Sequence, residues 1–578
     1  MRNTNEPTPA SAEQNRPTRG SVQQLKDSPT TSVLIIGGGI NGVGTFRDLS
    51  LQGVDVTLVE RGDYCQGASG ASSHMIHGGI RYLENGEFRL VRESVIERNA
   101  LLKLAPHYVK PLQTTIPIFS TFSGILTAPL RFLTHRSGAP KERGAVLIKA
   151  GLTLYDAFSR AGGTVPRHRF VGRKASLAQL PSLRQDVKYT ATYFDASVHN
   201  PERLTLDVLQ DGLSANPRSR AVNYVSAVGS NAEGVVLRDE LTGDVFTVKA
   251  DVVVNATGAW VDGTNSALGN ASRFMGGTKG SHIVLDHPEL LAACDGREIF
   301  FEHSDGRIVL IYPMGERVLV GTTDIDTDME TQAVCTDAEI DYFFELIHHV
   351  FPKVRVDRED IVYTFSGVRP LPRHDDTQPG FVSRDYRIEH GSTAGRPTLS
   401  LVGGKWTTFR ALSEHLADEV LTLLQRSRTT STASLPIGGG RNFPQQADEL
   451  TSWIEANRAG LPAEQMHRLL ARYGTRSADV AAFLAAGSDT ALSSTLEVTA
   501  RELEYMVRHE QVQHIPDVLI RRTALAFNGL VSAELVEELA EVLGAHLAWS
   551  ESDRRQEIEN TRRVLQEDHR VSVRSLVA

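Results

Sequence analysis

The 578-residue sequence predicts an α/β fold with a parallel sheet near its start and a helical domain at its end. Three observations support this prediction. The apolar run at 32–36 is continuous and leads into a glycine-rich turn, which is typical of a parallel strand buried on both faces. The run at 251–256 repeats this pattern, and the chain from about residue 442 onward is almost wholly helical in its patterning. Because the chain is too long for one small core, two or three structural units are expected.

The first strand belongs to a β-α-β unit of dinucleotide-binding length. The spacing predicts a helix from about Ile40 to Gln52 and a second strand over 54–59. Between the first strand and the helix lies Gly37-x-Gly39-x-x-Gly42. Gly37 permits a tight turn, Gly39 lets the backbone approach a pyrophosphate, and Gly42 allows the helix to pack closely on the strand.

The helix start and the end of the second strand supply the polar contacts of this unit. Ile40 and Asn41 lie at the helix N-terminus, where free amides and a partial positive charge favour a phosphate. Glu60 lies at the tip of the second strand and can accept hydrogen bonds from ribose hydroxyls. An acidic residue there disfavours the 2′-phosphate of NADP, but it leaves NAD and FAD open.

A loop of small residues, GASGASSHMIHGG over 67–79, favours FAD. Small side chains let backbone amides approach the pyrophosphate and ribityl chain of a flavin. The alternative is a flexible surface linker. The candidate contacts in the loop are Ser72, Ser73, His77, Gly78 and Gly79.

Composition excludes several other classes. A net charge of −9 argues against a general nucleic-acid binder. The three cysteines are odd in number and widely spaced, so we expect no disulfide framework and no metal site. No apolar run is long enough to span a membrane, and residues 1–30 lack a secretory signal. We expect those first 30 residues to be a disordered polar tail and the protein to be cytoplasmic.

The motifs carry a family resemblance. GGGINGVG, SSHMIHGGIRYLENGEFRLVRES, KGSHIVL, GTTDID, FSGVRPL and GGKWTTFR, in order over 32–410, closely resemble the FAD-dependent glycerol-3-phosphate dehydrogenases of the aerobic, quinone-reducing type. Residues 505–527 resemble that family's C-terminal helical domain. The resemblance implies a Rossmann-like FAD-binding domain over 31–430, interleaved with an antiparallel-sheet substrate domain of the D-amino-acid-oxidase type at roughly 107–200 and 270–390. A helical domain over 440–578 would follow.

The family oxidises sn-glycerol 3-phosphate to dihydroxyacetone phosphate by hydride transfer to FAD, which requires cations for the phosphate. By resemblance, Arg81, Tyr82, Arg384 and Lys405 bind that phosphate, and Arg369 lies near the reacting hydroxyl. Any single arginine among them could instead form a surface ion pair. The set as a whole favours a dianionic phosphate over a single carboxylate.

His282 matches the family's active-site histidine and is the predicted proton acceptor, since histidine titrates near neutral pH. Arg369 is the rival, acting by stabilising the developing alkoxide. Asp324 either binds substrate or only ends a strand.

Other matching positions border the flavin. The resemblance places Val225 at the adenine, Thr257 and Gly258 at the adenosine half, and Gly403, Gly404 and Thr407 at the flavin ring. Each also has an ordinary reading as a strand residue, a turn glycine or a helix cap. Related sequences generally have lysine where this chain has His74, which leaves the charge beside the flavin loop open.

The resemblance also implies an electron acceptor, which is quinone in most relatives and oxygen in some. Residues 116–155 combine apolar pieces with five Lys or Arg against one Glu, which suggests peripheral contact with the inner face of the cell membrane. A surface insertion is the alternative. A homodimer is a compatible assembly.

Two rival functions remain at this point. One is another flavin oxidase of the same fold that acts on an amine or amino acid. The other is a non-enzymatic FAD-binding or redox-sensing protein, which the proton acceptor and the phosphate cluster argue against.

Overall fold

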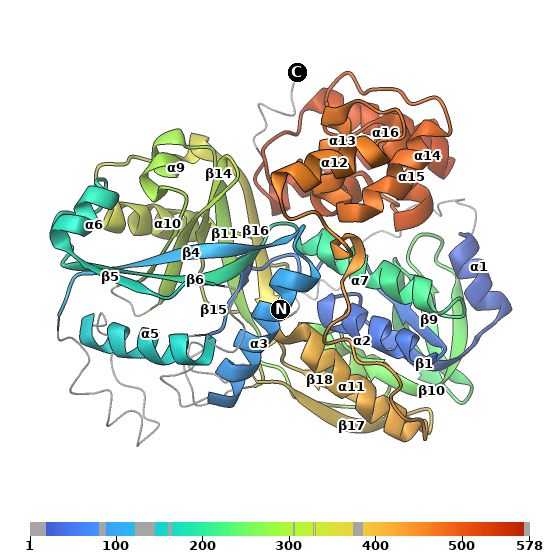
Figure 1. Cartoon of the computed structure of the whole chain (residues 1–578). Coiled ribbons are helices and arrows are strands. Elements are labelled where there is room, and N and C mark those ends of the chain that lie inside the picture. Colours follow the sequence, from blue (N-terminus) through green and yellow to red (C-terminus); the bar gives the residue numbers. More distant parts are fainter. Residues whose placement is uncertain are drawn as a thin grey trace, which may run out of the picture.

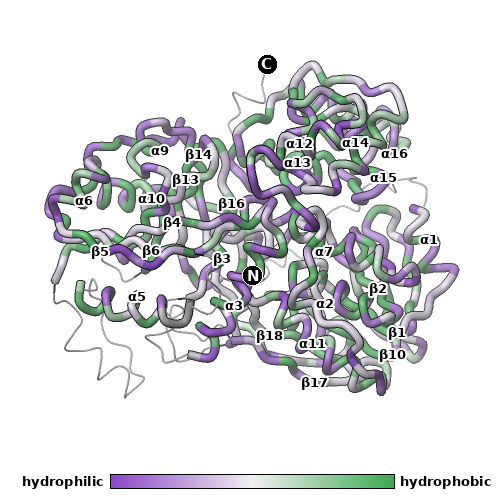
Figure 2. The backbone as a smooth tube through the Cα atoms, viewed as in Figure 1, coloured by the Kyte–Doolittle hydropathy of each residue, from purple (hydrophilic) through white to green (hydrophobic). Residues whose placement is uncertain are grey.

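Three units make up the computed structural model, which describes residues 19–79, 88–121, 145–159, 165–303, 307–327, 329, 331–373 and 385–571. A parallel-sheet unit and an antiparallel-sheet unit lie side by side, and a helical domain lies above the parallel-sheet unit (Figure 1). Its core also contacts the antiparallel-sheet unit. Hydrophobic segments run through the interior of each unit, while hydrophilic segments follow the outer helices and loops (Figure 2).

The parallel sheet is built from strands that are far apart in the chain. Its order is β17 (Arg387–Thr393), β18 (Arg396–Val402), β10 (Val245–Asn255), β1 (Thr30–Ile36), β2 (Val56–Val59) and β7 (Arg220–Val222). Every neighbouring pair is parallel except β17–β18. A ribbon of β8 (Val225–Asn231) and β9 (Gly234–Asp239) extends from β10. Four consecutive buried residues, 33–36, explain why β1 reads as a continuous apolar run.

Helices cover one face of this sheet and the ribbon covers the other. The covering helices are α2 (Ile40–Leu51), α7 (Pro201–Ala215) and α11 (Phe409–Leu423), with α2 between the other two. Their apolar faces meet the sheet in one core that includes Val43, Phe46 and Leu412. On the other face, α8 (Val261–Ala267) lies against β8.

A short helix, α1 (Gly20–Asp27), precedes the first strand and packs beside β7 and β10. The expectation that residues 1–30 form a disordered tail is therefore wrong for this part. The helix buries only Val22 and Leu25, so its periodic signal is weak. Contacts with the rest of the molecule stabilise it, as is usual for short helices.

The second sheet runs in the order β15 (Ile325–Asp326), β11 (Thr278–Leu285), β14 (Arg317–Gly321), β13 (Ile308–Met314), β12 (Glu298–Glu302), β4 (Val109–Ile118), β6 (Tyr189–Val198) and β3 (Met75–Ile76). Strand β16 (Ile361–Arg369) pairs with β11, and β5 (Arg169–Gly172) pairs with β6. Helices α3 (Phe88–Leu104), α5 (Ala145–Ser159), α6 (Arg173–Gln179), α9 (Pro288–Cys294) and α10 (Asp337–Val350) surround it. Because the strands of both sheets alternate along the chain, the two units are interleaved, as expected.

The C-terminal domain contains α12 (Ala447–Asn457), α13 (Ala463–Tyr473), α14 (Ser477–Ala485), α15 (Ala500–Glu510), α16 (Ala533–Leu547) and α17 (Glu551–Arg563). A π-helical turn, Asp517–Arg522, joins α15 to α16, and a second one, Val564–Asp568, follows α17. Short 3₁₀ turns lie at Gly258–Trp260, Arg358–Asp360, Trp406–Thr408, Gly438–Gly440 and Gly474–Arg476. The apolar core of this domain is continuous with Tyr363 and Phe365 of β16.

In the part of the chain that the structure describes, no helix combines the length and the apolar character needed to cross a bilayer.

Candidate active site

The turn between β1 and α2 is closed so tightly that it requires glycine. Gly37 has a φ of +113°, and a Cβ there would lie 2.7 Å from the carbonyl oxygen of Ala256. A Cβ on Gly42 would lie 2.0 Å from the carbonyl oxygen of Gly37. Gly39 is the N-cap of α2 and has no side chain between the helix amides and a ligand. This geometry fits a phosphate at the helix N-terminus.

Glu60 follows β2 and faces the same turn. Its two carboxylate oxygens accept hydrogen bonds from the amides of Gly38 (2.7 Å) and Gly62 (2.8 Å). Burial raises the pKa of Glu60, and these two hydrogen bonds oppose that shift. Each oxygen keeps a second lone pair, which a ribose hydroxyl can use. The amide of Val225 donates to the Glu60 carbonyl (2.8 Å). Val225, the predicted contact of the adenine, therefore lies next to Glu60, the predicted contact of the ribose.

The small-residue loop is anchored along its described length. The Ile40 amide donates to Ser69 Oγ (3.0 Å), and Trp406 Nε1 donates to the Ser69 carbonyl (2.8 Å). The His77 amide donates to Thr407 Oγ1 (3.2 Å). These contacts contradict the alternative of a flexible linker and place the loop over the start of α2.

The loop also rests on a buried polar cluster beneath Gly78. The Gly78 amide donates to Tyr155 and to Asp195, each at 3.0 Å. A Cβ on Gly78 would lie 2.2 Å from the Tyr155 hydroxyl. Arg98 is fully buried and donates to Asp195 at 2.8 Å, so the cluster pairs its charges. Next to Gly78, Gly79 has a φ of +74°.

Two strand ends return to the same region. Thr257 donates its hydroxyl to Asn255 (2.7 Å), and Gly258, with a φ of +62°, begins the next turn. After β18, Gly403 and Gly404 have φ values of +87° and +104°.

The residues of this region fit the predicted FAD. A Cβ on Gly404 would lie 2.7 Å from Asn41 Nδ2, so the glycine lets that chain end approach α2 closely. Asn41 Oδ1 is buried and has no hydrogen-bond partner among the described residues, so it is available to a ligand hydroxyl.

His282 lies on β11, near one end of the second sheet, between β14 and β16. It pairs in register with Gly321 on one side and with Phe365 on the other, and its ring stacks on Phe365 with centroids 4.7 Å apart. A Cβ on Gly321 would lie 2.2 Å from the imidazole, so the ring needs a glycine there. His282 Nε2 lies 2.8 Å from Ser73 Oγ of the small-residue loop 67–79.

Burial strongly shifts the titration of His282. The side chain is 2% exposed, and desolvation lowers its pKa well below the usual value, with the positive charge of Arg369 acting in the same direction. The imidazole is therefore neutral at pH 7 and able to accept a proton.

Arg369 ends β16 beside this histidine. Its guanidinium donates to Asp324 Oδ1, to Thr322 Oγ1 and to the Thr323 carbonyl, each at 2.9 Å. A Cβ on Gly280 would lie 2.2 Å from Arg369 Nη2, so the guanidinium lies over that glycine. Asp324 thus orients Arg369.

Lys405 is the one predicted phosphate ligand that falls within the described residues. Its ammonium donates to Ser94 Oγ of α3 at 2.5 Å. The other three, Arg81, Tyr82 and Arg384, lie outside the described residues, as does part of the segment 116–155.

His74 brings no charge to the small-residue loop 67–79. It is buried, its Nδ1 lies 3.1 Å from the Val198 carbonyl, and its ring packs against Phe365 and Phe527. Desolvation lowers its pKa to about 4. A neutral ring therefore fills this position of the 67–79 loop.

Several neighbours of the site escaped prediction from the sequence. Trp406 lies inside a motif that carried the resemblance, so its anchoring role could have been proposed. Ser94 is the last residue of another such motif, over 72–94, so its contact with Lys405 could have been proposed in the same way. Tyr155 and Asp195 have no local signal, because their roles depend on contacts between distant segments.

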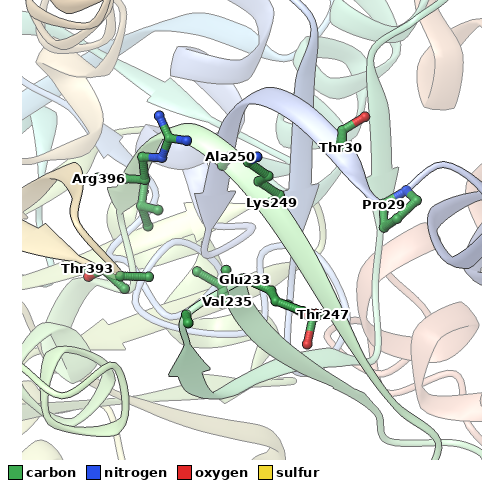
Figure 3. A pocket seen from close by; sticks show the side chains of 13 residues that line it. Pro29, Thr30, Glu233, Val235, Thr247, Lys249, Ala250, Thr393 and Arg396 are labelled. Atoms are coloured by element: carbon green, nitrogen blue, oxygen red, sulfur yellow. The ribbon is translucent and has the colours of Figure 1, made fainter.

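A surface pocket of about 500 Å³ lies elsewhere (Figure 3). It is lined by Thr30, Lys249 and Arg396, among others, at the starts of the parallel strands. The glycine turn lies at the opposite end of β1, about 20 Å away by the rise of a strand. Ligands of such sheets bind beyond the carboxyl ends of the strands, so this pocket is not the candidate site.

Two family models match this chain. Residues 32–410 match the family model described as FAD dependent oxidoreductase, and residues 430–554 match the C-terminal domain of alpha-glycerophosphate oxidase.

Curated relatives match along most of their length. A glycerol-3-phosphate dehydrogenase of Synechocystis sp. is 33% identical over 545 residues, covering 90% of this chain and 93% of that protein. A D-erythritol 1-phosphate dehydrogenase of Brucella abortus is 32% identical over 506 residues, covering 86% and 95%. The solved glycerol-3-phosphate dehydrogenase from Bacillus halodurans, complexed with FAD, has a TM-score of 0.71 at 22% identity and covers 95% of this chain and 97% of that one.

Proposed function

Because the chain belongs to the FAD-dependent glycerol-3-phosphate dehydrogenase family, we propose that it oxidises sn-glycerol 3-phosphate to dihydroxyacetone phosphate. The observation that carries this proposal is the place of His282, whose Nε2 lies 2.8 Å from Ser73 Oγ of the 67–79 loop and whose pKa is lowered by the nearby charge of Arg369. When bound, FAD supplies the acceptor for the hydride that leaves the substrate carbon.

The turn Gly37–Gly42 and the N-terminus of α2 would hold the pyrophosphate, with Glu60 at the ribose and Val225 at the adenine. Ser72, Ser73, His77, Gly78 and Gly79 would line the flavin from one side. Thr257, Gly258, Gly403, Gly404 and Thr407 would do so from the other strand ends.

His282 would take the proton of the substrate hydroxyl at Nε2. In the structure, the Ser73 hydroxyl lies 2.8 Å from this atom, which marks the side from which a hydroxyl reaches it. The low pKa of the buried ring keeps the imidazole neutral at neutral pH, and in the tautomer that carries its proton on Nδ1 the Nε2 atom can accept a proton. Arg369, oriented by Asp324, would stabilise negative charge on the substrate oxygen.

Arg81, Tyr82, Arg384 and Lys405 would bind the phosphate. Among them, Lys405 is held at α3 by Ser94. A phosphorylated polyol such as D-erythritol 1-phosphate, the substrate named for one relative, is the second candidate substrate because it presents the same phosphate group.

Reduction of the bound flavin under anaerobic conditions tests the substrate. Bleaching of the flavin band by sn-glycerol 3-phosphate, but not by glycerol, glycine or D-alanine, is the expected result. Faster bleaching by D-erythritol 1-phosphate would assign the longer polyol phosphate instead. Bleaching by an amino acid alone would overturn the proposal in favour of an amino-acid oxidase.

The His282→Ala variant tests the proton acceptor. General-base catalysis contributes about 10²- to 10⁴-fold, so turnover measured by dye reduction should fall by that factor. The FAD content should change much less than turnover, because the glycine turn, Glu60 and the start of α2 keep their own hydrogen bonds. Wild-type turnover would remove His282 from the mechanism.

For the electron acceptor we propose quinone, with peripheral binding at the inner face of the cell membrane and a homodimer as the assembly. Reoxidation of the reduced enzyme by a quinone analogue should be faster than by oxygen. Flotation with anionic vesicles at low salt, lost at high salt, is expected for the docked protein. Sedimentation velocity checks the dimer.

A further inference from the structure

A buried carboxylate joins the C-terminal domain to the FAD-binding unit. Asp63 follows Glu60 by three residues and is fully buried. Its oxygens accept hydrogen bonds from Arg521 Nε (2.6 Å), from Arg522 Nη1 (2.6 Å) and Nη2 (2.9 Å), and from Asn223 Nδ2 (3.0 Å). The two arginines overcome the effect of burial and hold the pKa of Asp63 well below its usual range, so the carboxylate stays ionised.

Both arginines belong to the C-terminal domain, in the π-helical turn Asp517–Arg522. Arg522 is itself fully buried and also donates to the Glu510 carbonyl at 2.8 Å. Arg521 donates to Asp517 as well, at 2.5 Å. The π-helical turn is therefore held within the C-terminal domain while its two arginines bind Asp63 of the FAD-binding unit.

Asp63 lies within the segment that shapes the glycine turn. On one side of it, the Glu60 carboxylate receives the amides of Gly38 and Gly62. On the other side, the Cys65 amide donates to the Gly38 carbonyl at 3.0 Å. Asp63 thus lies three residues after Glu60 and two residues before Cys65, the two residues that hold Gly38, so a shift of Asp63 would move the glycine turn and Glu60 together.

Neighbouring contacts reinforce this junction. Tyr64 donates its hydroxyl to Gln511 (3.2 Å), and Tyr224, next to Val225, donates its hydroxyl to Asp517 (2.7 Å). The Tyr224 amide donates to the Gly62 carbonyl at 2.9 Å. The C-terminal domain therefore contacts the adenosine side of the site from several directions.

We propose that Arg521 and Arg522 are positioning residues for the FAD site, and that the C-terminal helical domain fixes the adenosine end of the cofactor through Asp63. Neither arginine needs to touch FAD. Their effect passes through Asp63 to Glu60 and Gly38. The inference rests on FAD as the cofactor and is independent of the substrate.

Affinity for FAD, measured with apoprotein and no substrate, tests this proposal. Quenching of flavin fluorescence gives the Kd for wild type, Arg522→Met and a matched control, Arg476→Met. Arg476 also links the C-terminal domain to the FAD-binding unit, through Asp211 on α7 at 2.7 Å, but it does not reach the Asp63 loop. Urea unfolding of each apoprotein measures the general loosening that either change causes.

We expect the Kd for FAD to rise at least about tenfold in Arg522→Met and to change less than about twofold in Arg476→Met, while both variants lose stability. An unchanged Kd in Arg522→Met, or an equal rise in both variants, would overturn the proposal. Arg522→Lys keeps the charge and should recover part of the affinity.

Should Arg522→Met fail to fold, Arg521→Met is the second variant. It keeps both hydrogen bonds from Arg522 to Asp63, so it should raise the Kd for FAD by a smaller factor. A wild-type Kd in that variant would equally count against the proposal. Because no substrate is present, failure of glycerol 3-phosphate to bleach the flavin would leave the result intact.

Discussion

At the scale of single residues, the surroundings of His282 set its chemistry. An exposed histidine is partly protonated near neutral pH, but this ring is stacked between strands, beside a cation, and stays neutral. Its partner Ser73 comes from a loop more than 200 positions away in the chain. The motif identified the histidine, whereas its stacking on Phe365 and its neutrality depend on strand register, which no local pattern reveals.

The pH dependence of activity should follow from this burial. We expect kcat/KM of the wild type to be flat from pH 6.5 to 8, since His282 titrates well below that range. Phe365→Ala would hydrate the ring and raise its pKa towards the usual value, so activity should fall on acidification below pH 6.5. Dye-reduction assays across pH 5.5–8.5 measure this, with Phe365→Leu as the control. Identical profiles in wild type and Phe365→Ala would contradict the expectation.

Glu298 predicts a pH dependence of stability. It is fully buried on β12, accepts one hydrogen bond from Thr114 (2.7 Å), and desolvation raises its pKa from 4.5 to about 8. The folded state therefore keeps a proton that the unfolded state releases, so this contribution is complete below pH 4.5 and is lost as pH rises through about 8.

The Glu298→Gln variant removes that titration while keeping a polar group of similar size. Its free energy of unfolding, relative to the wild type, should improve between pH 5 and pH 9 by an amount on the order of a few kcal/mol. Urea unfolding at pH 5, 7 and 9 checks this difference. A difference that stays constant with pH would show that Glu298 ionises normally.

At the scale of elements, the segment β1–turn–α2 was predicted with near-correct bounds because its constraints are local. Strand burial, the glycine spacing and the terminal acid all lie within 31 residues, from Thr30 to Glu60. Strand β3 pairs its two residues with β6, and β12 pairs in parallel with β4. Such pairings are non-local, so the sequence indicates the strands without their partners.

Gly42 allows a direct test of the turn. Gly42→Ala places a methyl group 2.0 Å from the Gly37 carbonyl oxygen, so the turn must open and FAD should be lost on purification. Gly263→Ala in α8 is the control, because its Cβ would meet nothing within 4 Å. That variant should keep FAD and gain roughly 0.5 to 1 kcal/mol of stability. Absorbance at the flavin band gives the FAD content, and full occupancy in Gly42→Ala would refute the turn's role.

At the scale of the whole molecule, α1 shows how distant parts are joined. Arg19 donates to Asn223 Oδ1 (2.9 Å) and to the Asn223 carbonyl (2.8 Å), and Asn223 in turn holds Asp63. The N-terminal helix, the FAD-binding unit and the C-terminal domain therefore meet around one polar centre. No sequence pattern predicts these long-range contacts.

Removing the apolar contacts of α1 should weaken the whole chain. Val22→Ser with Leu25→Ser exposes the core face that these side chains cover, and burial of each contributes about 1.5 to 3 kcal/mol. The urea midpoint should therefore drop, whereas Gln23→Ala, which loses only an exposed hydrogen bond to Asp27, should leave it within error. Equal midpoints for all three proteins would show that α1 only rests on the surface.

The family, the fold class and FAD were predicted correctly from the sequence, because ordered motifs cover most of the chain. The roles of His282, Arg369 and Lys405 stay predictions, as do those of Arg81, Tyr82 and Arg384, which lie outside the described residues. The expected disordered tail was wrong over Gly20–Asp27, because α1 depends on tertiary contacts that its own eight residues do not encode.

The order of strands in the parallel sheet has a consequence for how the protein is made. Strand β1 is flanked by β10 and β2, and the sheet is completed only by β18, which ends at Val402. The partners of Asp63 emerge later still, at Arg521 and Arg522. The residues that stabilise the glycine turn are therefore synthesised long after the turn itself. We expect cofactor capture to be a late event in biogenesis, following synthesis of the helical domain.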